Sequence, residues 1–364
     1  LLIGGQASDF GLVDVQFAAE MVGFVLEDAG GPAMQMFLML VAVLVSAIFF
    51  DFINGFHDTA NAMATTVYTK ALPVRLAILM SACMNFIGAL TSEKVALTIA
   101  TGMVDIQLDL YVILSALIGA VIWDFFTWWR SIPSSSSHAL IGSLIGATIV
   151  FTGTTAHVEW MGVLEKVVIP LFTSPLIGLC LGFFIMKIVF ELFANWTPKH
   201  ANKFFLRLEV LSSALMAYSH GNNDAQKTMG IITLALISAG DLSASSGVPL
   251  WVKLLCAVTM AIGTSVGGQR IMRTVGNGVT KLNPVIGFVA QTSSTIAIEI
   301  MTALGAPVST TQVVTTSIMG AGSARRFSSV RWGVARKIIG AWFITLPITI
   351  VLGGACAWII GLML

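Results

Sequence analysis

The sequence predicts an all-α polytopic membrane protein with two inverted-topology repeats, broken helices, and re-entrant or half-length helices. Of its 364 residues, 56% are hydrophobic and 10% are charged, whereas soluble domains have roughly 25% charged residues. The apolar runs are about 20 residues long, which suits helices that span a bilayer and not the short alternating strands of a membrane barrel. A polar motif inside these runs occurs twice, as in duplicated transporters.

Before the first half lie residues 1–35, where acidic residues interrupt apolar ones. This pattern indicates an extracytoplasmic amphipathic segment on the membrane surface. We expect the first span to run from about residue 36 to 68, broken at the motif, with further spans at about 76–92 and 110–129. Aromatic residues gather at the end of the last of these spans, as they do at membrane interfaces.

The stretch 133–138 reads Pro-Ser-Ser-Ser-Ser-His and precedes an apolar run that ends near residue 151. This run is short for a span, and its polar start could not face lipid, so we expect a re-entrant or half-length helix. Residues 162–193 form another long apolar stretch, in which two prolines predict a break. The polar connector 195–207 then divides the two halves.

The second half, residues 208–364, repeats the plan of the first, residues 36–194. The polar motif around Asp58 returns around Asp224, 166 residues later, and the hydroxyl motif returns after 174 residues. Two separations this similar indicate a duplication of the whole half. The spans expected in the second half lie at about 208–239, 250–267, 284–304 and 338–364.

Charge gives the orientation of the halves, because Lys and Arg mark cytoplasmic loops. The loop after the first Asp motif carries Lys70 and Arg75, whereas its counterpart carries Asp241. The loops after the hydroxyl motifs reverse this, with Glu159 in the first half and Arg325 in the second. Equivalent loops therefore lie on opposite sides of the membrane. The repeats are inverted, the connector is cytoplasmic, and both chain ends lie outside. We expect a multi-pass plasma-membrane protein, and a net charge of +1 gives no field to attract nucleic acid.

The two Asp motifs, residues 55–61 and 221–227, are the costly features of the sequence, since a carboxylate in lipid is expensive and usually functional. In a helix, Asp58 shares a face with Asn61, and Asp224 shares one with Lys227. Carboxylate and amide oxygens are hard ligands for a small cation, and a carboxylate also takes a proton. The structural alternative is that both aspartates only pair with a buried base or cap a broken helix.

The two hydroxyl motifs suit an anion. Pro is favoured in the first turn of a helix, and Ser or Thr at its N-cap. A half-helix that starts at mid-depth points free N–H groups and its positive dipole end at the cavity, so two such ends would surround a tetrahedral oxyanion with donors. The alternative is that the hydroxyls bond back to their own helices. The candidate anion ligands are Ser134, Ser135, Ser136, Ser137, Ser309, Thr310 and Thr311.

The histidines near these motifs have several interpretations. His57 and His138 are candidate ligands, proton carriers or simply buried histidines with satisfied hydrogen bonds, and His220 is a further auxiliary candidate. Ser135, His57 and Asp58 could form a hydrolase triad. The sequence contains no nucleophile elbow, however, and we therefore do not expect an enzyme.

The four motifs together resemble the paired signatures of the inorganic phosphate transporter (PiT) family, and the resemblance covers essentially the whole chain. It implies an ion-coupled phosphate symporter with two inverted repeats. It places the anion at the hydroxyl motifs and the coupling cation, a sodium ion or a proton, at the Asp/Asn motifs. Lys227 is a further candidate ligand of the anion. Gln312 stands where the family usually has His, which argues against a paired-histidine role. The implied cation ligands are Asp58, Asn61, Asn223, Asp224 and Asn54.

The expected function is therefore a secondary active symporter that imports inorganic phosphate with sodium ions or protons by alternating access, without any other cofactor. Within the class, the alternatives are a sulfate permease and a carrier of metal–phosphate complexes, which some bacterial members transport. From another class, an anion channel is the alternative. Whether the protein forms a homodimer is left open.

Charge balance predicts the coupling. A phosphate dianion beside Asp58 and Asp224 makes four negative charges, and Lys227 leaves the site near −3. Such a concentration of charge is untenable at low dielectric, so about two sodium ions or protons are expected to enter with the anion. Hydrogen phosphate has an O–H that can donate to a carboxylate, whereas sulfate has none, so we expect phosphate to be preferred.

Overall fold

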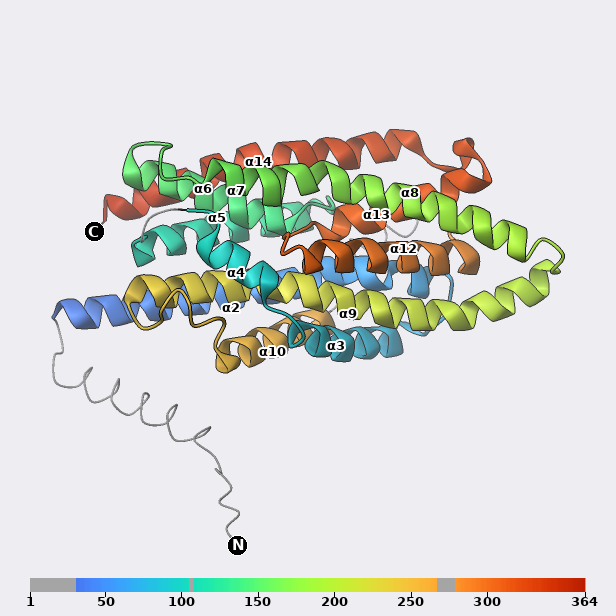
Figure 1. Ribbon diagram of the computed structural model, residues 1–364, viewed down its shortest axis with the longest axis horizontal. Coiled ribbons are helices and arrows are strands. Elements are labelled where there is room, and N and C mark those ends of the chain that lie inside the picture. The colour runs from blue at the N-terminus through green and yellow to red at the C-terminus, as the bar shows by residue number, and fades with distance from the viewer. Residues whose placement is uncertain (1–30, 105–107, 267–278, 364) are drawn as a thin grey trace, which may run out of the picture.

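A computed structural model describes residues 31–104, 108–266 and 279–363, without the side chains of residues 59–61. Most of the predicted N-terminal amphipathic segment lies outside these residues. In the described part of the chain the fold is a bundle of helices that run along one long axis, and the only β-structure there is an isolated bridge between Val104 and Val158 (Figure 1). The expected all-α architecture is confirmed.

The helices are named in chain order as in Figure 1. Those of the first half are α2 (Pro32–Tyr68), α3 (Val74–Ala89), α4 (Lys94–Thr101), α5 (Leu110–Trp129), α6 (Ser136–Thr152), α7 (Trp160–Val163) and α8 (Ile169–Leu192). Those of the second half are α9 (Pro198–Ala239), α10 (Leu250–Val266), α12 (Pro284–Ala303), α13 (Thr310–Arg325) and α14 (Trp332–Gly361). A π-helical segment (Leu164–Val168) precedes α8, and a short 3-10 turn (Phe327–Ser329) precedes α14.

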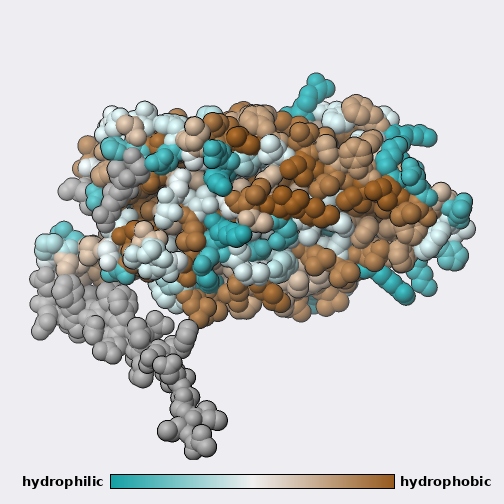
Figure 2. Space-filling model, viewed as in Figure 1, coloured by the Kyte–Doolittle hydropathy of each residue, from teal (hydrophilic) through white to brown (hydrophobic). Residues whose placement is uncertain are grey.

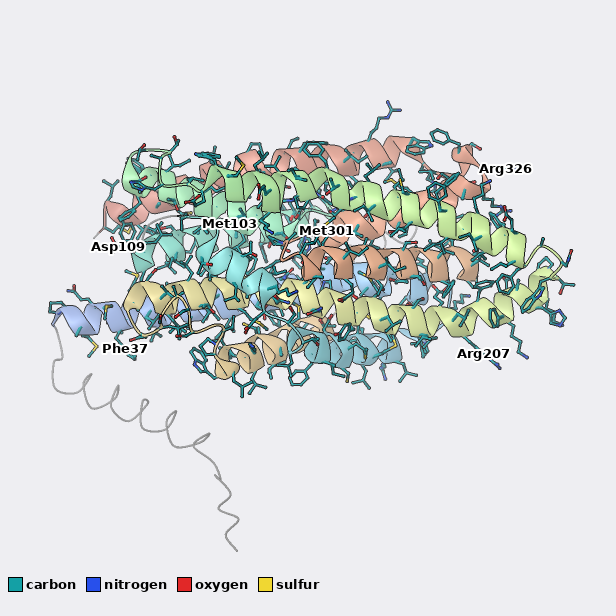
Figure 3. All side chains as sticks on the ribbon, viewed as in Figure 1. Phe37, Met103, Asp109, Arg207, Met301 and Arg326 are labelled. Carbon is teal, nitrogen blue, oxygen red and sulfur yellow. The ribbon has the colours of Figure 1, made fainter. Side chains whose placement is uncertain are left out.

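Five helices in the described residues are long and apolar enough to cross a membrane, and α3 with α4 forms a sixth candidate that bends by 63°. Apolar side chains cover much of the flank of the bundle, while hydrophilic ones gather at its right-hand end (Figure 2). Arg207 and Arg326 lie at that end, and Asp109 lies at the opposite one (Figure 3). The preference of basic residues for the cytoplasmic side therefore predicts that the bundle axis lies along the membrane normal.

The structure differs from the sequence in how continuous some helices are. Both α2 and α9 run through their Asp motifs without a break, because the motif side chains find partners on neighbouring helices and the backbone can stay helical. The break predicted within 162–193 is only the π-helical segment. It ends beside Pro170, which stands in the first turn of α8, where a missing N–H costs little. The connector is also mostly helical, since its residues from Pro198 onward begin α9.

The half-length helices were predicted correctly. Helix α6 has 17 residues and α13 has 16. Each begins with a capping serine, since Ser135 accepts a hydrogen bond from the backbone N–H of His138, and Ser309 accepts one from that of Gln312. Both helices start near the middle of the bundle and run to opposite ends (Figure 1). Their N-termini therefore point at the centre of the molecule.

The packing of the two halves supports inverted repeats. Helices α2 and α9 lie side by side and run in opposite directions (Figure 1). Gly55 lets α2 approach α10, because a Cβ there would lie 2.8 Å from the Met260 carbonyl oxygen, and Gly221 lets α9 approach α3 at Asn85. Helix contacts of one half recur in the other when α2, α3, α5, α6 and α8 are exchanged with α9, α10, α12, α13 and α14.

Candidate functional site

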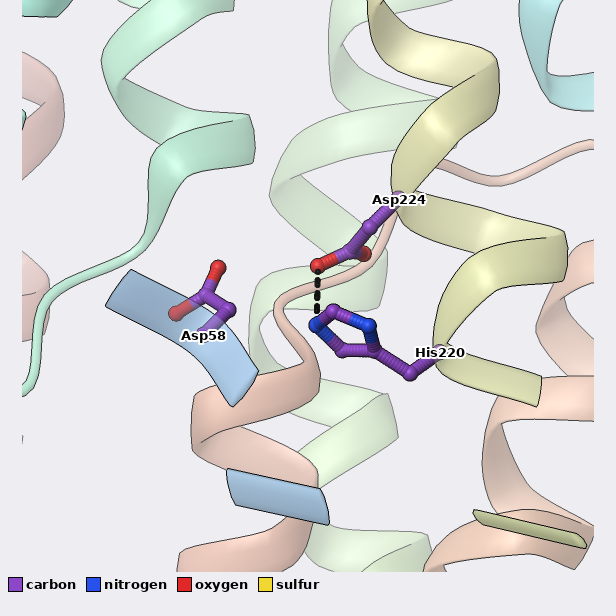
Figure 4. A group of neighbouring side chains, drawn as sticks. All are labelled: Asp58, His220 and Asp224. Atoms are coloured by element: carbon purple, nitrogen blue, oxygen red, sulfur yellow. Dashed lines mark ion pairs between the residues drawn. The ribbon is translucent and has the colours of Figure 1, made fainter. Parts of the chain in front are cut away.

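The two Asp motifs meet at the centre of the bundle. Ligand atoms of Asp58, His220 and Asp224 all lie within 4.8 Å of one another, and all three side chains are buried. Asp58 comes from α2 and the other two from α9; His220 and Asp224 point toward each other, and Asp58 lies opposite them (Figure 4). Residues 166 positions apart in the chain therefore form one site.

Each aspartate is bonded to the half-length helix of its own half. Ser136 Oγ donates a hydrogen bond to Asp58 Oδ2 at 3.0 Å, and Thr310 Oγ1 donates one to Asp224 Oδ2, also at 3.0 Å. Asp58 is also bonded to the other half, because its Oδ1 accepts a hydrogen bond from Thr311 Oγ1 at 2.9 Å. The hydroxyl motifs and the Asp motifs thus converge as the sequence analysis expected. Hydrogen bonds to ionised carboxylates are among the stronger ones in proteins.

One ammonium group and two imidazoles complete this centre. Lys227 Nζ lies 2.7 Å from Asp224 Oδ1 and donates to Ser136 Oγ at 3.5 Å, so it bridges the second Asp motif and the first hydroxyl motif. His57 Nδ1 lies 3.0 Å from Asp58 Oδ1. His220 Nε2 lies 3.2 Å from Asp224 Oδ2. Lys227 is fully buried, and a buried charge is tolerable only when it is paired in this way.

The other predicted hydroxyls bond elsewhere. Ser134 shares a hydrogen bond of 2.8 Å with Thr127 on α5, and Ser137 donates to the Val308 carbonyl at 2.7 Å. Ser135 and Ser309 accept backbone N–H groups as helix caps, which leaves their own O–H groups able to donate into the centre. The structure therefore places Ser136, Thr310 and Thr311 against carboxylates, and the remaining hydroxyls around them.

The predicted amide ligands are more dispersed. Asn223 Nδ2 donates to Thr302 Oγ1 at 2.8 Å and to the Ala306 carbonyl at 3.3 Å, so its amide faces α12 and the loop after it. The buried amide of Asn54 has no hydrogen-bond partner within the described residues. The side chain of Asn61 lies outside them.

His138 and Gln312 occupy equivalent positions in the two half-length helices and are both buried. Within the described ranges, His138 Nδ1 and the side-chain amide of Gln312 have no hydrogen-bond partner. Neither contacts Asp58 or Asp224 by any bond recorded there. The structure therefore gives His138 no place in the central set, in contrast to His57 and His220.

Two buried aspartates were missed by the sequence analysis. Asp51 lies two turns before Asp58 and accepts a hydrogen bond from Thr228 at 2.9 Å. Asp124 lies on α5, and its charge interacts with those of His57 and Asp58. A single acidic residue in an otherwise uncharged span was the available signal. At Asp124 that signal was obscured by the aromatic residues of the expected interface belt.

The centre is rich in negative charge. Four aspartates of the described residues (Asp51, Asp58, Asp124 and Asp224) are buried, and Lys227 is the one buried lysine or arginine among those residues. Charges of one sign at low dielectric attract counter-ions strongly. The arrangement therefore suits small cations at its carboxylates, next to the hydroxyl donors and helix N-termini that suit an anion.

Comparison with known proteins shows what the chain as a whole is similar to. The model of the "Phosphate transporter family" matches residues 54–198 and 191–353. A relative from Bacillus subtilis (strain 168), named "Probable low-affinity inorganic phosphate transporter", is 43% identical over 329 residues, which are 90% of this chain and 98% of the relative. One of the same name from Rhizobium meliloti (strain 1021) is 45% identical over 322 residues, which are 88% of this chain and 96% of that one.

A solved structure described as "The sodium-dependent phosphate transporter" has the same fold, with a TM-score of 0.82 at 24% sequence identity. The match covers 90% of this chain and all of that one. The relatives are transporters and not enzymes, and the apolar helices make this chain a multi-pass protein of the cell membrane. The family match over most of the length, together with relatives above 40% identity, shows that the chain belongs to the phosphate transporter family.

Proposed function

We propose that the protein is a secondary active symporter that imports inorganic phosphate together with cations by alternating access. The observation that carries this proposal is the convergence of two aspartates and two hydroxyl-bearing helix ends on one buried centre. The anion site and the cation site share hydrogen bonds, so binding of one ligand changes the affinity for the other. The free energy of this change in affinity is the coupling between the two sites.

The anion would bind where the half-length helices begin. Helices α6 and α13 direct their N-termini to the centre, and Ser135 and Ser309 cap them with O–H groups left to donate. Lys227 adds a positive charge at the same place. Tetrahedral oxyanions suit such a ring of donors. Phosphate is the anion in the names of the relatives, and sulfate is the alternative within the class.

The cations would bind at Asp58 and Asp224. In the described structure Ser136 and Thr311 donate their hydroxyl protons to Asp58. A cation at this carboxylate would compete with these bonds and release the hydroxyls to donate to phosphate. Bound cations would also offset the negative charge that otherwise repels the anion. The structural neighbour, described as sodium-dependent, makes sodium the first candidate, and protons remain the second.

Asp58, His220 and Asp224 favour a second candidate function, the import of a metal–phosphate complex. An imidazole nitrogen and two carboxylates within 4.8 Å form a ligand set that divalent transition metals accept, whereas sodium prefers oxygen ligands. A metal held there would share the anion with the hydroxyl motifs. Its positive charges would replace those of separate coupling ions.

Alternating access follows from the proposed inverted repeats. The centre lies where the two halves meet, and the halves pack with equivalent sets of helices. If each half can adopt the arrangement now held by the other, the protein has two conformations, and the centre opens toward a different side of the membrane in each. A channel would need no such exchange.

The test is uptake of labelled phosphate into proteoliposomes, with sodium and proton gradients imposed separately and with divalent metals either present or chelated. Saturable uptake driven by one of these gradients is expected. Uptake that is linear in phosphate and indifferent to every gradient would indicate an anion channel. Uptake that requires a divalent metal would favour the metal–phosphate complex.

A further inference from the structure

The oxygens of the central aspartates are already engaged. Asp58 accepts from Ser136 and Thr311, and His57 lies beside it. Asp224 accepts from Thr310, and Lys227 and His220 lie within ion-pair distance of it. These two carboxylates therefore suit cations and hydroxyl donors. They have no free oxygen with which to distinguish one oxyanion from another.

Asp124 differs from both. Its side chain is 0% exposed, and neither carboxylate oxygen has a hydrogen-bond partner in the described part of the chain. No lysine, arginine or histidine of those residues lies within ion-pair distance of it. A buried carboxylate without partners is costly, and inside a membrane span such a group usually serves the transported ligand.

The neighbours of Asp124 place it beside the first hydroxyl motif. Thr127 is one turn further along the same face of α5, and its hydroxyl donates to the Asp124 carbonyl at 3.1 Å. The same hydroxyl shares a hydrogen bond of 2.8 Å with Ser134. The buried carboxylate is also within electrostatic range of His57 and Lys227, and of Asp58 and Asp224. Helix α5 therefore borders the proposed anion seat through Thr127, and Asp124 lies one turn before that residue.

We propose that Asp124 selects the oxyanion by accepting a hydrogen bond from its O–H group. The proposal rests on the proposed function, in which phosphate binds at the hydroxyl motifs. Hydrogen phosphate brings an O–H that satisfies a free carboxylate oxygen. Sulfate brings none at neutral pH, so a bare anion oxygen would face the carboxylate. A contact that is repulsive for the competitor and attractive for the substrate is an effective source of specificity.

Monofluorophosphate tests the effect of this hydrogen bond on affinity without a change in the size or charge of the anion. It is a tetrahedral dianion of nearly the same size as hydrogen phosphate, and at pH 8 it has no O–H. Arsenate keeps the O–H. We would measure displacement of labelled phosphate from the purified full-length protein at pH 8 by arsenate, sulfate and monofluorophosphate. For the wild-type protein, arsenate is expected to compete within a few-fold of phosphate, and the other two about 100-fold more weakly or worse.

The Asp124→Asn variant should lose this discrimination, since an amide can donate to sulfate as well as accept from phosphate. Its preference for phosphate over sulfate and over monofluorophosphate should fall about tenfold or more. The matched control is Glu209→Gln, which neutralises another buried carboxylate, one outside the centre that accepts a hydrogen bond from Thr69. This control should keep the wild-type ratios. Asp124→Glu, which restores the carboxylate, should recover most of the discrimination.

Either of two results would overturn the proposal: wild-type ratios in Asp124→Asn, or monofluorophosphate displacing phosphate from the wild-type protein as well as phosphate itself does. The second measurement needs no variant, so it can overturn the proposal even if substitutions at Asp124 prevent folding. Failure of the proposed function would look different. In that case the folded wild-type protein would not bind labelled phosphate at all.

Discussion

Thr311 of α13 donates a hydrogen bond of 2.9 Å to Asp58 of α2, across 253 residues of chain. This bond joins the hydroxyl motif of one half to the Asp motif of the other. Asp58 is thereby held by both halves, since Ser136 of its own half donates to the second oxygen. Movement of one half against the other has to change the surroundings of this carboxylate.

Replacing Thr311 with Val should weaken the link between cation and phosphate binding. The substitution keeps the shape of the side chain but removes a bond to a charged group, which contributes about 1.5–3 kcal/mol. The apparent affinity for the coupling cation should therefore change by roughly ten- to a hundredfold. The measurement is phosphate uptake against cation concentration. Thr315→Val is the control, because that hydroxyl bonds to the Thr311 carbonyl of its own helix, and an equal shift in both variants would disprove the specific role.

Neutralising either central aspartate should abolish uptake driven by a cation gradient. Asp58→Asn and Asp224→Asn keep the side-chain size and remove the charge that balances the cation, so the folded variants should not couple. Uptake would be measured at several sodium concentrations and pH values, with sulfate as a competitor. Asp109→Asn, at an exposed position before α5, should behave as wild type. Wild-type cation dependence in both central variants would remove these residues from the coupling site.

The double variant Ser135→Ala with Ser309→Ala should bind phosphate much more weakly. Each serine caps a half-length helix with its oxygen and has an O–H available for the anion. Loss of two bonds to a desolvated anion, at about 1.5–3 kcal/mol each, should lower the apparent affinity by roughly two to four decades if the effects add. Each lost cap should also lower stability by about 1 kcal/mol.

Thr148→Val is a suitable control for this double variant, since Thr148 lies on α6 and bonds to the Leu144 carbonyl. It should leave phosphate affinity unchanged. If the double variant is destabilised and yet binds phosphate normally, the two serines act only as helix caps. Thermal unfolding and phosphate binding, measured on the same preparations, distinguish these outcomes.

Cysteine labelling tests the inverted topology. Single cysteines at Thr69 and Ser328 should react from the cytoplasm, and those at Thr155 and Ser243 from outside. The parent protein must first lose Cys83 and Cys180, which are exposed. Labelling of Thr69 and Ser243 from the same side of the membrane would contradict inverted repeats. A membrane-impermeant thiol reagent applied to intact cells and to inverted vesicles gives the two readings.

The sequence by itself determined the spans and the motifs. The span predicted at 110–129 is helix α5 as observed, and the span expected at 284–304 differs from α12 by one residue at the end. The span expected at 250–267 starts where α10 does and agrees with it up to Val266, the last described residue there. Helix length in a membrane follows from the length of the apolar run, which is a local property. The capping serines Ser135 and Ser309 could also be predicted from the sequence, because a helix N-cap depends on residues only three positions away.

Only the tertiary structure decided which side chains meet. That Ser136 rather than Ser137 faces Asp58 depends on the rotation of α6 about its axis, which is fixed by packing against α5 and α14. The continuity of α2 through its motif and the hydrogen bond from Thr311 to Asp58 likewise depend on neighbouring helices. Partners of a buried polar group are set by contacts between distant segments. A polar residue in an apolar run shows that such a partner is needed, but it does not show which residue supplies it.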